Sequence, residues 1–139
     1  MWCAVNSETR NWLASAEYDL QTARDMLKSG RYLYVVFMCH LAIEKTLEAL
    51  VCEATSAAPP RIHDLERLSQ LAGVALAPRL EQFIAELTDA SITTRYPEDL
   101  ARMVSKYPES VASSYMQRTE EVTSWLASDP RLQPPSPAT

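Results

Sequence analysis

Glycine and histidine are scarce in this sequence of 139 residues, which contains two of each. The two glycines, Gly30 and Gly73, are too few for a glycine-rich phosphate loop or for a fold built from many tight β-turns. The two histidines, His40 and His63, lie 23 positions apart, and no pair of Cys or His has the close spacing of zinc ligands. We therefore expect neither a metal site nor a cofactor.

Cysteine and basic charge are limited as well. The three cysteines are odd in number and form no C-x-x-C pair, so we expect buried thiols in a reducing cytoplasm. The N-terminus lacks the pattern of a signal peptide, and no apolar run reaches the roughly 20 residues that span a bilayer. The net charge of −5 provides no overall attraction to nucleic acid or to anionic membranes.

The most apolar stretch of the chain, from Arg31 to Glu53, organises the predicted fold. Between Tyr32 and Ile43 it is apolar on every side apart from His40, which indicates either a buried strand or a buried helix. Its length favours the helix, because the pattern continues into the strong helix formers between Glu44 and Leu50 without a turn signal. We therefore predict a helix at the centre of a helical bundle.

Further helices are predicted on both sides of this central segment. A three-four alternation of apolar residues predicts a first helix with Ser7 as its N-cap and Gly30 at its end. The connection to the central helix is then very short, so the two helices should be antiparallel neighbours. A short helix is predicted after Asp64, and Pro78 suits the first turn of the next one.

The remaining chain is less regular. The small polar segment Asp89–Thr94 predicts a loop, and Glu98–Tyr107 predicts a turn or two of helix with Leu100, Met103 and Val104 facing the core. A last helix follows Pro108, with a stripe formed by Val111, Tyr115, Arg118, Val122 and Trp125. The prediction is an all-α, up-and-down bundle of four to five helices over residues 7–128, followed by a disordered proline-rich tail over residues 129–139.

Two polar residues, His40 and Glu44, interrupt the central helix one turn apart. One interpretation is structural: a hydrogen bond between them satisfies both within the core. The other is functional: the pair offers a donor and an acceptor to a ligand in a polar cleft. Both interpretations require partners for these groups, because burying an unpaired polar group is costly.

Two further segments combine arginine with a side chain suited to binding. Pro59 and Pro60 stiffen the approach to Arg61 and His63, which face either solvent or an anion at the N-terminus of the short helix. In the segment Arg95-Tyr96-Pro97, the guanidinium and the ring are either ordinary loop side chains or are held for phosphate binding and base stacking. The candidate residues for a nucleotide or phosphate are His40, Glu44, Arg61, His63, Arg95 and Tyr96.

Taken in order, these segments resemble the HEPN domain, a small helical bundle named for its occurrence in higher eukaryotes and prokaryotes and for nucleotide binding. The resemblance lies in WLASAEYDLQTARDMLKSGRY, FMCHLAIEKTLEAL, PPRIHDLERL and RYP, and extends from about Trp12 to Trp125. It implies a bundle of four or five helices that forms a homodimer. For many small bacterial and archaeal members it also implies a partner, a minimal nucleotidyltransferase, often within a toxin–antitoxin pair.

A nuclease branch of that family carries an R-x(4–6)-H motif that is thought to cleave RNA. In this sequence Arg31 lies nine positions before His40, and Arg61 lies two positions before His63, so neither spacing fits. We therefore expect a nucleotide-binding partner subunit of a nucleotidyltransferase rather than an enzyme. The alternative is an RNase toxin with a non-standard site built from His40, His63 and Arg95.

Overall fold

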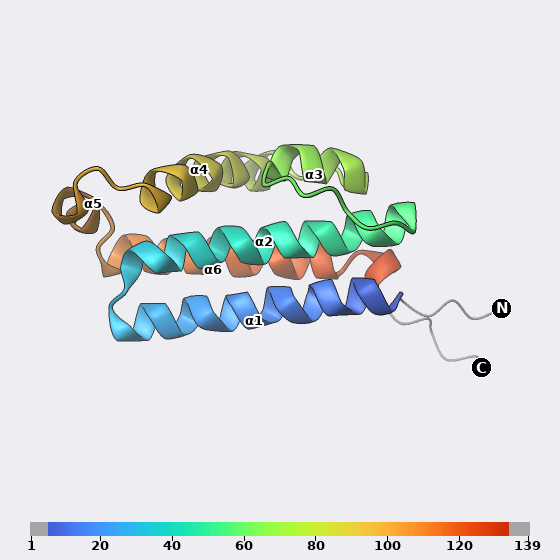
Figure 1. The fold of residues 1–139 in the computed structure, drawn as a ribbon, viewed down its shortest axis with the longest axis horizontal. Helices are drawn as coiled ribbons and strands as arrows, with labels where there is room; N and C mark the ends of the chain where they lie inside the picture. The colour runs from blue at the N-terminus through green and yellow to red at the C-terminus, as the bar shows by residue number, and fades with distance from the viewer. Residues whose placement is uncertain (1–5, 134–139) are drawn as a thin grey trace.

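The fold is entirely helical over residues 6–133, the part of the chain that the computed structural model describes (Figure 1). These residues form six α-helices, one 3₁₀ helix and no β-strand. The elements are α1 (Ser7–Ser29), α2 (Tyr32–Thr55), α3 (Leu65–Ala72), α4 (Pro78–Arg95), α5 (Leu100–Lys106), α6 (Glu109–Ala127) and the 3₁₀ helix η1 (Pro130–Leu132). The predicted all-α bundle is confirmed.

The ends of α1 are set by its capping residues. The side chain of Asn6 accepts a hydrogen bond of 2.8 Å from the backbone N–H of Glu8, so Asn6 is the N-cap and the predicted cap, Ser7, is wrong by one residue. At the other end Gly30 has a φ of +80°, a left-handed conformation that glycine adopts without a steric penalty. Only Gly30 and Arg31 separate α1 from α2, which therefore form the predicted antiparallel pair (Figure 1).

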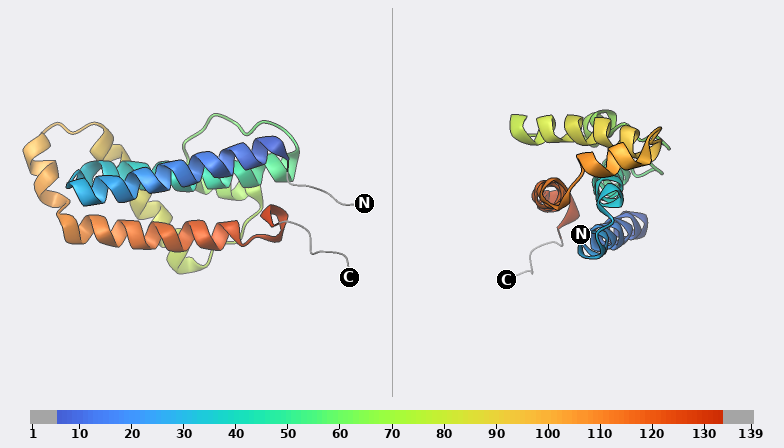
Figure 2. Two further views of the ribbon diagram at one scale, coloured as in Figure 1. Left: turned by 90° about the horizontal axis from the view of Figure 1, so that it is seen from below. Right: turned by 90° about the vertical axis from the view of Figure 1, so that its left-hand side faces the viewer.

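α2 is the centre of the bundle, as predicted. It packs against each of the other five α-helices and against η1, and seen end-on it lies between α1, α4 and α6 (Figure 2). The side chains of Ile43, Leu47 and Leu50 are completely buried. Burial of each such side chain contributes about 1.5–3 kcal/mol, so α2 supplies a large share of the hydrophobic stabilisation.

α3 and α4 lie along the side of α2 that faces away from α1 (Figure 1). α3 begins after its N-cap Asp64 and ends at Gly73, as predicted. α4 begins at Pro78, also as predicted, but it continues as far as Arg95. The loop predicted at Asp89–Thr94 is therefore wrong.

The small polar residues of Asp89–Thr94 are compatible with a helix because their hydroxyl groups bond to the helix itself. The hydroxyls of Thr93 and Thr94 donate to backbone carbonyls four residues earlier, and that of Ser91 donates to a carbonyl three residues earlier. Ala90 and Ser91 are also buried against the bundle. Tertiary packing thus outweighs the low helix propensity of serine and threonine.

α5 and α6 differ from the prediction in which residues face the core. Met103 is buried in α5, but Leu100 and Val104 are 60% and 51% exposed, so two of the three predicted core residues lie at the surface. In α6 the buried stripe is shifted by about one residue, leaving Trp125 exposed. The buried residues of α6 are Ala112, Met116, Thr119, Val122, Thr123 and Leu126.

The packed part of the chain also extends past residue 128, where the tail was predicted to begin. Leu132 is buried, and Arg131 donates a hydrogen bond of 2.7 Å from Nη1 to the carbonyl oxygen of Ala72. Arg131 also pairs with Asp129 at 2.8 Å. Residues 129–133 therefore pack on the bundle, and residues 134–139 of the predicted tail lie outside the described residues.

Candidate functional site

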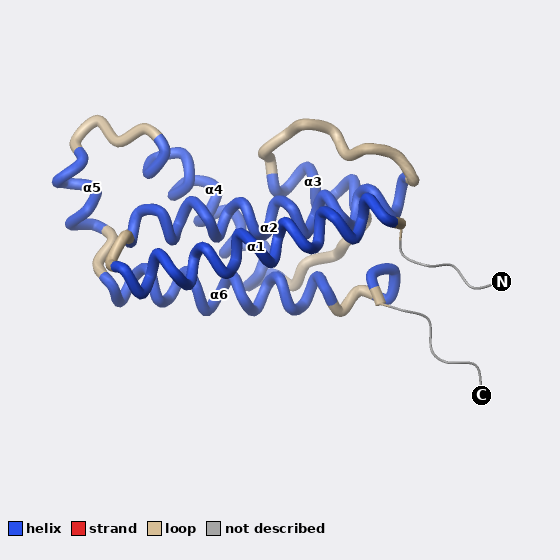
Figure 3. Tube along the Cα trace, turned by 60° about the horizontal axis from the view of Figure 1, so that its bottom comes forward, coloured by secondary structure: helices blue, strands red, loops and turns tan. Residues whose placement is uncertain are grey.

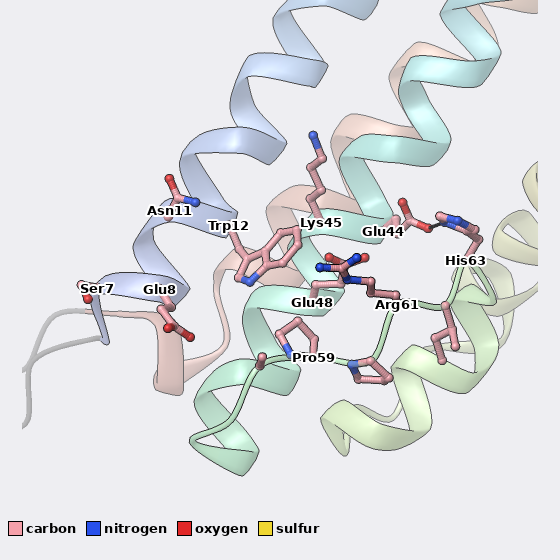
Figure 4. A pocket seen from close by; sticks show the side chains of 13 residues that line it. Ser7, Glu8, Asn11, Trp12, Glu44, Lys45, Glu48, Pro59, Arg61 and His63 are labelled. Carbon is pink, nitrogen blue, oxygen red and sulfur yellow. Dashed lines mark hydrogen bonds and ion pairs between the residues drawn. The ribbon is translucent and has the colours of Figure 1, made fainter.

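The loop of residues 56–64, which joins α2 to α3, is the longest connection in the described chain (Figure 3). Its residues line two cavities. The larger cavity, of about 820 Å³, lies between this loop, the start of α1 and α2 (Figure 4). The smaller cavity, of about 380 Å³, lies between α2, α4 and the residues that precede α3. His63 lines both, so the two cavities adjoin.

The six candidate residues gather around these cavities rather than around a single cleft. The larger cavity is lined by Glu44, Arg61 and His63, and the smaller one by His40, His63, Arg95 and Tyr96. These residues come from two helices and two connecting segments, so the fold, and not a local motif, brings them together.

The loop is held over α2 by its own packing. Ile62 packs against the hydrophobic core, and its backbone N–H donates a hydrogen bond of 2.9 Å to the carbonyl oxygen of Pro60. Asp64 then ends the loop by capping α3 through its carboxylate, which accepts the backbone N–H of Arg67. As a result, the packed loop positions Arg61 and His63 beside α2.

Glu44 and His63 form the contact at which the two cavities meet. Glu44 Oε1 lies 2.5 Å from His63 Nδ1, and because a carboxylate only accepts hydrogen bonds, the imidazole donates through Nδ1–H. The side chain of Glu44 is 4% exposed, whereas that of His63 is 69% exposed. The partner of Glu44 is therefore the loop histidine, and the interpretation in which Glu44 bonds to His40 is wrong.

His40 lies deep in the wall of the smaller cavity. It is 2% exposed, and its Nδ1 has no hydrogen-bond partner among the residues described. Burial, followed by the positive charges of Arg95 and His63, lowers the pKa of His40 to about 4. The imidazole is therefore neutral at pH 7, and its Nδ1 is buried in the cavity wall without a hydrogen-bond partner among the described residues.

Arg95 and Tyr96 border the same cavity from the end of α4. The guanidinium of Arg95 lies over the ring of Phe37, 4.9 Å from its centroid, and the buried Nε has no hydrogen-bond partner in the described part of the chain. Over the same residues no carboxylate lies within ion-pair distance of Arg95, while Tyr96 is 73% exposed. A cation that is oriented by an aromatic ring but lacks a counterion is suited to binding an anion.

Glu48 and Trp12 are among the residues of the larger cavity that the sequence analysis did not select (Figure 4). Glu48 lies one turn after Glu44 and is 7% exposed. Burial, followed by the charge of Glu44, raises the pKa of Glu48 to about 7. The sequence does contain an indication that Glu48 belongs to the site, because its spacing of four residues from Glu44 places both carboxylates on one helix face. Trp12 has no comparable signal.

Lys45 also lines the larger cavity, but its charge is already matched. Its Nζ lies 2.7 Å from Asp19 Oδ2, which joins α2 to α1. Asp19 itself is 8% exposed. We therefore assign this pair to the packing of the first two helices rather than to ligand binding.

These features together define a small helical domain with two adjoining cavities at the junction of a central helix and a long loop. The HEPN domain model matches residues 9–129, which is most of the chain, so this chain belongs to the HEPN domain family. No match is found among curated proteins. No helix in the described residues is both long and apolar enough to cross a membrane.

Two solved structures have the same fold as this chain. The crystal structure of TT1696 from Thermus thermophilus has a TM-score of 0.71 at 19% identity, over 87% of this chain and 97% of that one. The crystal structure of ST0689, described as an archaeal HEPN homologue, has a TM-score of 0.63 at 19% identity, over 85% and 93% of the two chains. At this identity the similarity concerns the fold.

Proposed function

We propose that this HEPN protein binds a nucleotide, with the phosphate held in the smaller cavity. The observation that carries the proposal is the unpaired guanidinium of Arg95 beside the buried, neutral His40. An anion in this cavity would meet a cation without a counterion and the exposed ring of Tyr96, with the neutral His40 buried in the wall beside them. These are groups that commonly contact phosphates and bases.

Calorimetry with nucleoside mono-, di- and triphosphates tests the nucleotide site. We expect weak binding that Arg95→Ala reduces about tenfold, since a hydrogen bond to a charged group contributes about 1.5–3 kcal/mol. Arg79→Ala is the matched control, because Arg79 lies at the other end of α4 and pairs with Glu121. Equal affinities for the parent and Arg95→Ala would show that the phosphate is bound elsewhere.

We further propose that the chain forms a homodimer. Four exposed apolar residues lie within one short stretch of the chain, at the end of α4 and on α5. They are Ile92, Tyr96, Leu100 and Val104, each at least 51% exposed. A concentration of such side chains is typical of an interaction surface. Light scattering should give twice the mass of the chain, and Leu100→Asp should shift it toward the monomer; a monomeric parent at micromolar concentration would refute the dimer.

The biological partner that we propose is a minimal nucleotidyltransferase, in a pair of the toxin–antitoxin type. Family membership supports this, because many small HEPN proteins act with such an enzyme. The buried thiols of Cys39 and Cys52 are consistent with a cytoplasmic protein. Co-expression with a nucleotidyltransferase encoded beside this chain, followed by purification through a tag on one of them, should recover both proteins. Recovery of the tagged protein alone would argue against the pair.

An RNase activity is the second candidate, because the smaller cavity brings His40, His63 and Arg95 together. We nevertheless expect no cleavage of RNA. His40 is almost completely buried and, with a pKa of about 4, is a poor general acid at pH 7, while Nδ1–H of His63 is engaged by Glu44. Cleavage of labelled RNA by the parent that is lost in His40→Ala or His63→Ala would favour the RNase instead.

A further inference from the structure

The two adjoining cavities differ in charge, and this difference sets the orientation of any ligand that spans them. The larger cavity is lined by three glutamates, Glu8, Glu44 and Glu48, against two cations, Arg61 and Lys45, and Lys45 is already paired with Asp19. The smaller one contains Arg95 and two histidines, and Asp64, its sole carboxylate among the described residues, caps α3. A phosphate is therefore favoured in the smaller cavity and disfavoured in the larger one.

Glu48 is the polar group of the larger cavity that most needs a partner. Glu48 is 7% exposed, yet no hydrogen bond or ion pair to its carboxylate is found within residues 6–133. Glu44 already accepts from His63, and Lys45 is already paired with Asp19. A buried carboxylate without donors is costly, so Glu48 is suited to a ligand that brings N–H groups into the cavity.

The walls beside Glu48 suit a flat ring. Trp12 points into the cavity from α1, and Pro59 and Pro60 line it from the loop (Figure 4). An indole face offers stacking to a planar aromatic ligand, and the two proline rings add rigid apolar surface. The shape of the cavity and its free carboxylate together indicate a planar heterocycle with N–H donors on one edge.

We propose that the larger cavity holds the base of the nucleotide, that the base is guanine, and that Glu48 accepts both N–H groups of its Watson–Crick edge. Guanine is the common base that presents two adjacent donors, N1–H and the 2-amino group, which match the two oxygens of one carboxylate. Adenine instead places an amino donor beside the acceptor N1, which a carboxylate repels. The sugar would then pass the Glu44–His63 contact, where the two cavities meet, on its way to Arg95. This inference rests on the nucleotide site proposed above.

Calorimetry at pH 8 with GMP, AMP and ribose 5-phosphate separates the base site from the phosphate site. We expect the parent to bind GMP about tenfold more tightly than AMP, in line with the discrimination of a good two-bond pair. Glu48→Gln should reverse this preference, because an amide presents one acceptor and one donor, which match adenine. Trp12→Phe should weaken both nucleotides while leaving ribose 5-phosphate unchanged.

Glu98→Gln is the control for Glu48→Gln, because Glu98 is exposed and lies outside both cavities. Circular dichroism of each variant establishes that the bundle is intact. Equal affinities of the parent for GMP and AMP, with Arg95-dependent binding of ribose 5-phosphate retained, would overturn the base assignment and leave the phosphate site standing. Absence of ribose 5-phosphate binding, or its persistence in Arg95→Ala, would overturn the phosphate site itself.

Discussion

Replacing Glu48 with glutamine should remove the loss of stability that ionisation of Glu48 causes between about pH 4.5 and 7. Burial and the neighbouring Glu44 raise the pKa of Glu48 from 4.5 to about 7 in the folded protein. Below pH 4.5 this carboxyl is protonated in both the folded and the unfolded protein, so its contribution to stability is fully present. Between pH 4.5 and 7 it ionises in the unfolded chain first, which favours unfolding. This contribution is lost as the pH rises to 7. Glutamine does not titrate, so the variant should escape this loss.

The size of the effect follows from the shift in pKa. One pKa unit corresponds to about 1.4 kcal/mol, so a shift from 4.5 to about 7 corresponds to at most about 3 kcal/mol. Water in the cavity screens the charge, and we therefore expect about 1–2 kcal/mol. The charged and titratable groups around Glu48 are Glu8 on α1, Glu44 and Lys45 on α2, and Arg61 and His63 on the loop. All of them remain in the variant, so the comparison isolates Glu48.

Urea unfolding of the parent and of Glu48→Gln at pH 5 and pH 8 measures this difference. Relative to the parent, the variant should gain about 1–2 kcal/mol in free energy of unfolding between the two pH values. Glu98→Gln, at an exposed position, should show no such gain. If the free energy of unfolding changes equally with pH in the parent and in Glu48→Gln, ionisation of Glu48 does not destabilise the folded protein.

Three further perturbations test other parts of the structure. Because the pKa of His40 is lowered from 6.5 to about 4, the unfolded chain binds the proton first, so the contribution of His40 to stability should fall as the pH drops from 6.5 to 4. His40→Gln should flatten this dependence in thermal unfolding, and an unchanged slope would contradict the assignment. Lys45→Met leaves the buried Asp19 without its cation and should lower the free energy of unfolding by about 2 kcal/mol; adding Asp19→Leu should recover most of it, and no recovery would speak against the pair. Leu132→Ala should cost about 2 kcal/mol in urea unfolding, while Tyr18→Ala, at an exposed position outside the proposed dimer surface, should cost less than about 0.5, and equal costs would refute the packing of η1.

The helical elements that were predicted well are those whose local chemistry and packing agree. Gly30 and Gly73 end helices because glycine adopts the left-handed conformation there, and Asp64 and Pro78 occupy the starts to which they are suited. The central helix was predictable because a segment that is apolar on all sides has few alternatives in a single domain. In these places one residue, or one short pattern, determines the local structure.

The errors arose where packing between distant segments decides. Nothing local distinguishes Asp89–Thr94 from a loop, since its helix depends on the burial of Ala90 and Ser91 against the bundle. Leu100 and Val104 follow a helical pattern, but α5 lies at one end of the bundle, with few neighbours to cover them (Figure 1). Apolar periodicity in the sequence shows that a helix has an apolar face, but it does not show whether another helix covers that face.

The sequence allowed the residues of the candidate site to be predicted, but not how they are arranged in space. Polar residues in an apolar helix, and arginines beside a histidine or a tyrosine, selected the six candidates that line the cavities. That Glu44 bonds to His63 instead of His40 depends on the path of the loop over α2, which the spacing of the residues does not encode. Trp12 reaches the larger cavity because α1 packs beside α2 at that level.

The two-residue connection between α1 and α2 has a consequence for how the protein folds. These are the two longest helices, and the turn at Gly30 and Arg31 brings them together with almost no loop to close. Contacts between segments that are adjacent in sequence cost little chain entropy, so this hairpin should form early and present the apolar surface of α2 to the later helices. Core substitutions in the hairpin, such as Ala23→Gly, should then slow folding, whereas Leu126→Ala in α6 should mainly speed unfolding in stopped-flow experiments. The chain would thus assemble outward from its N-terminal half.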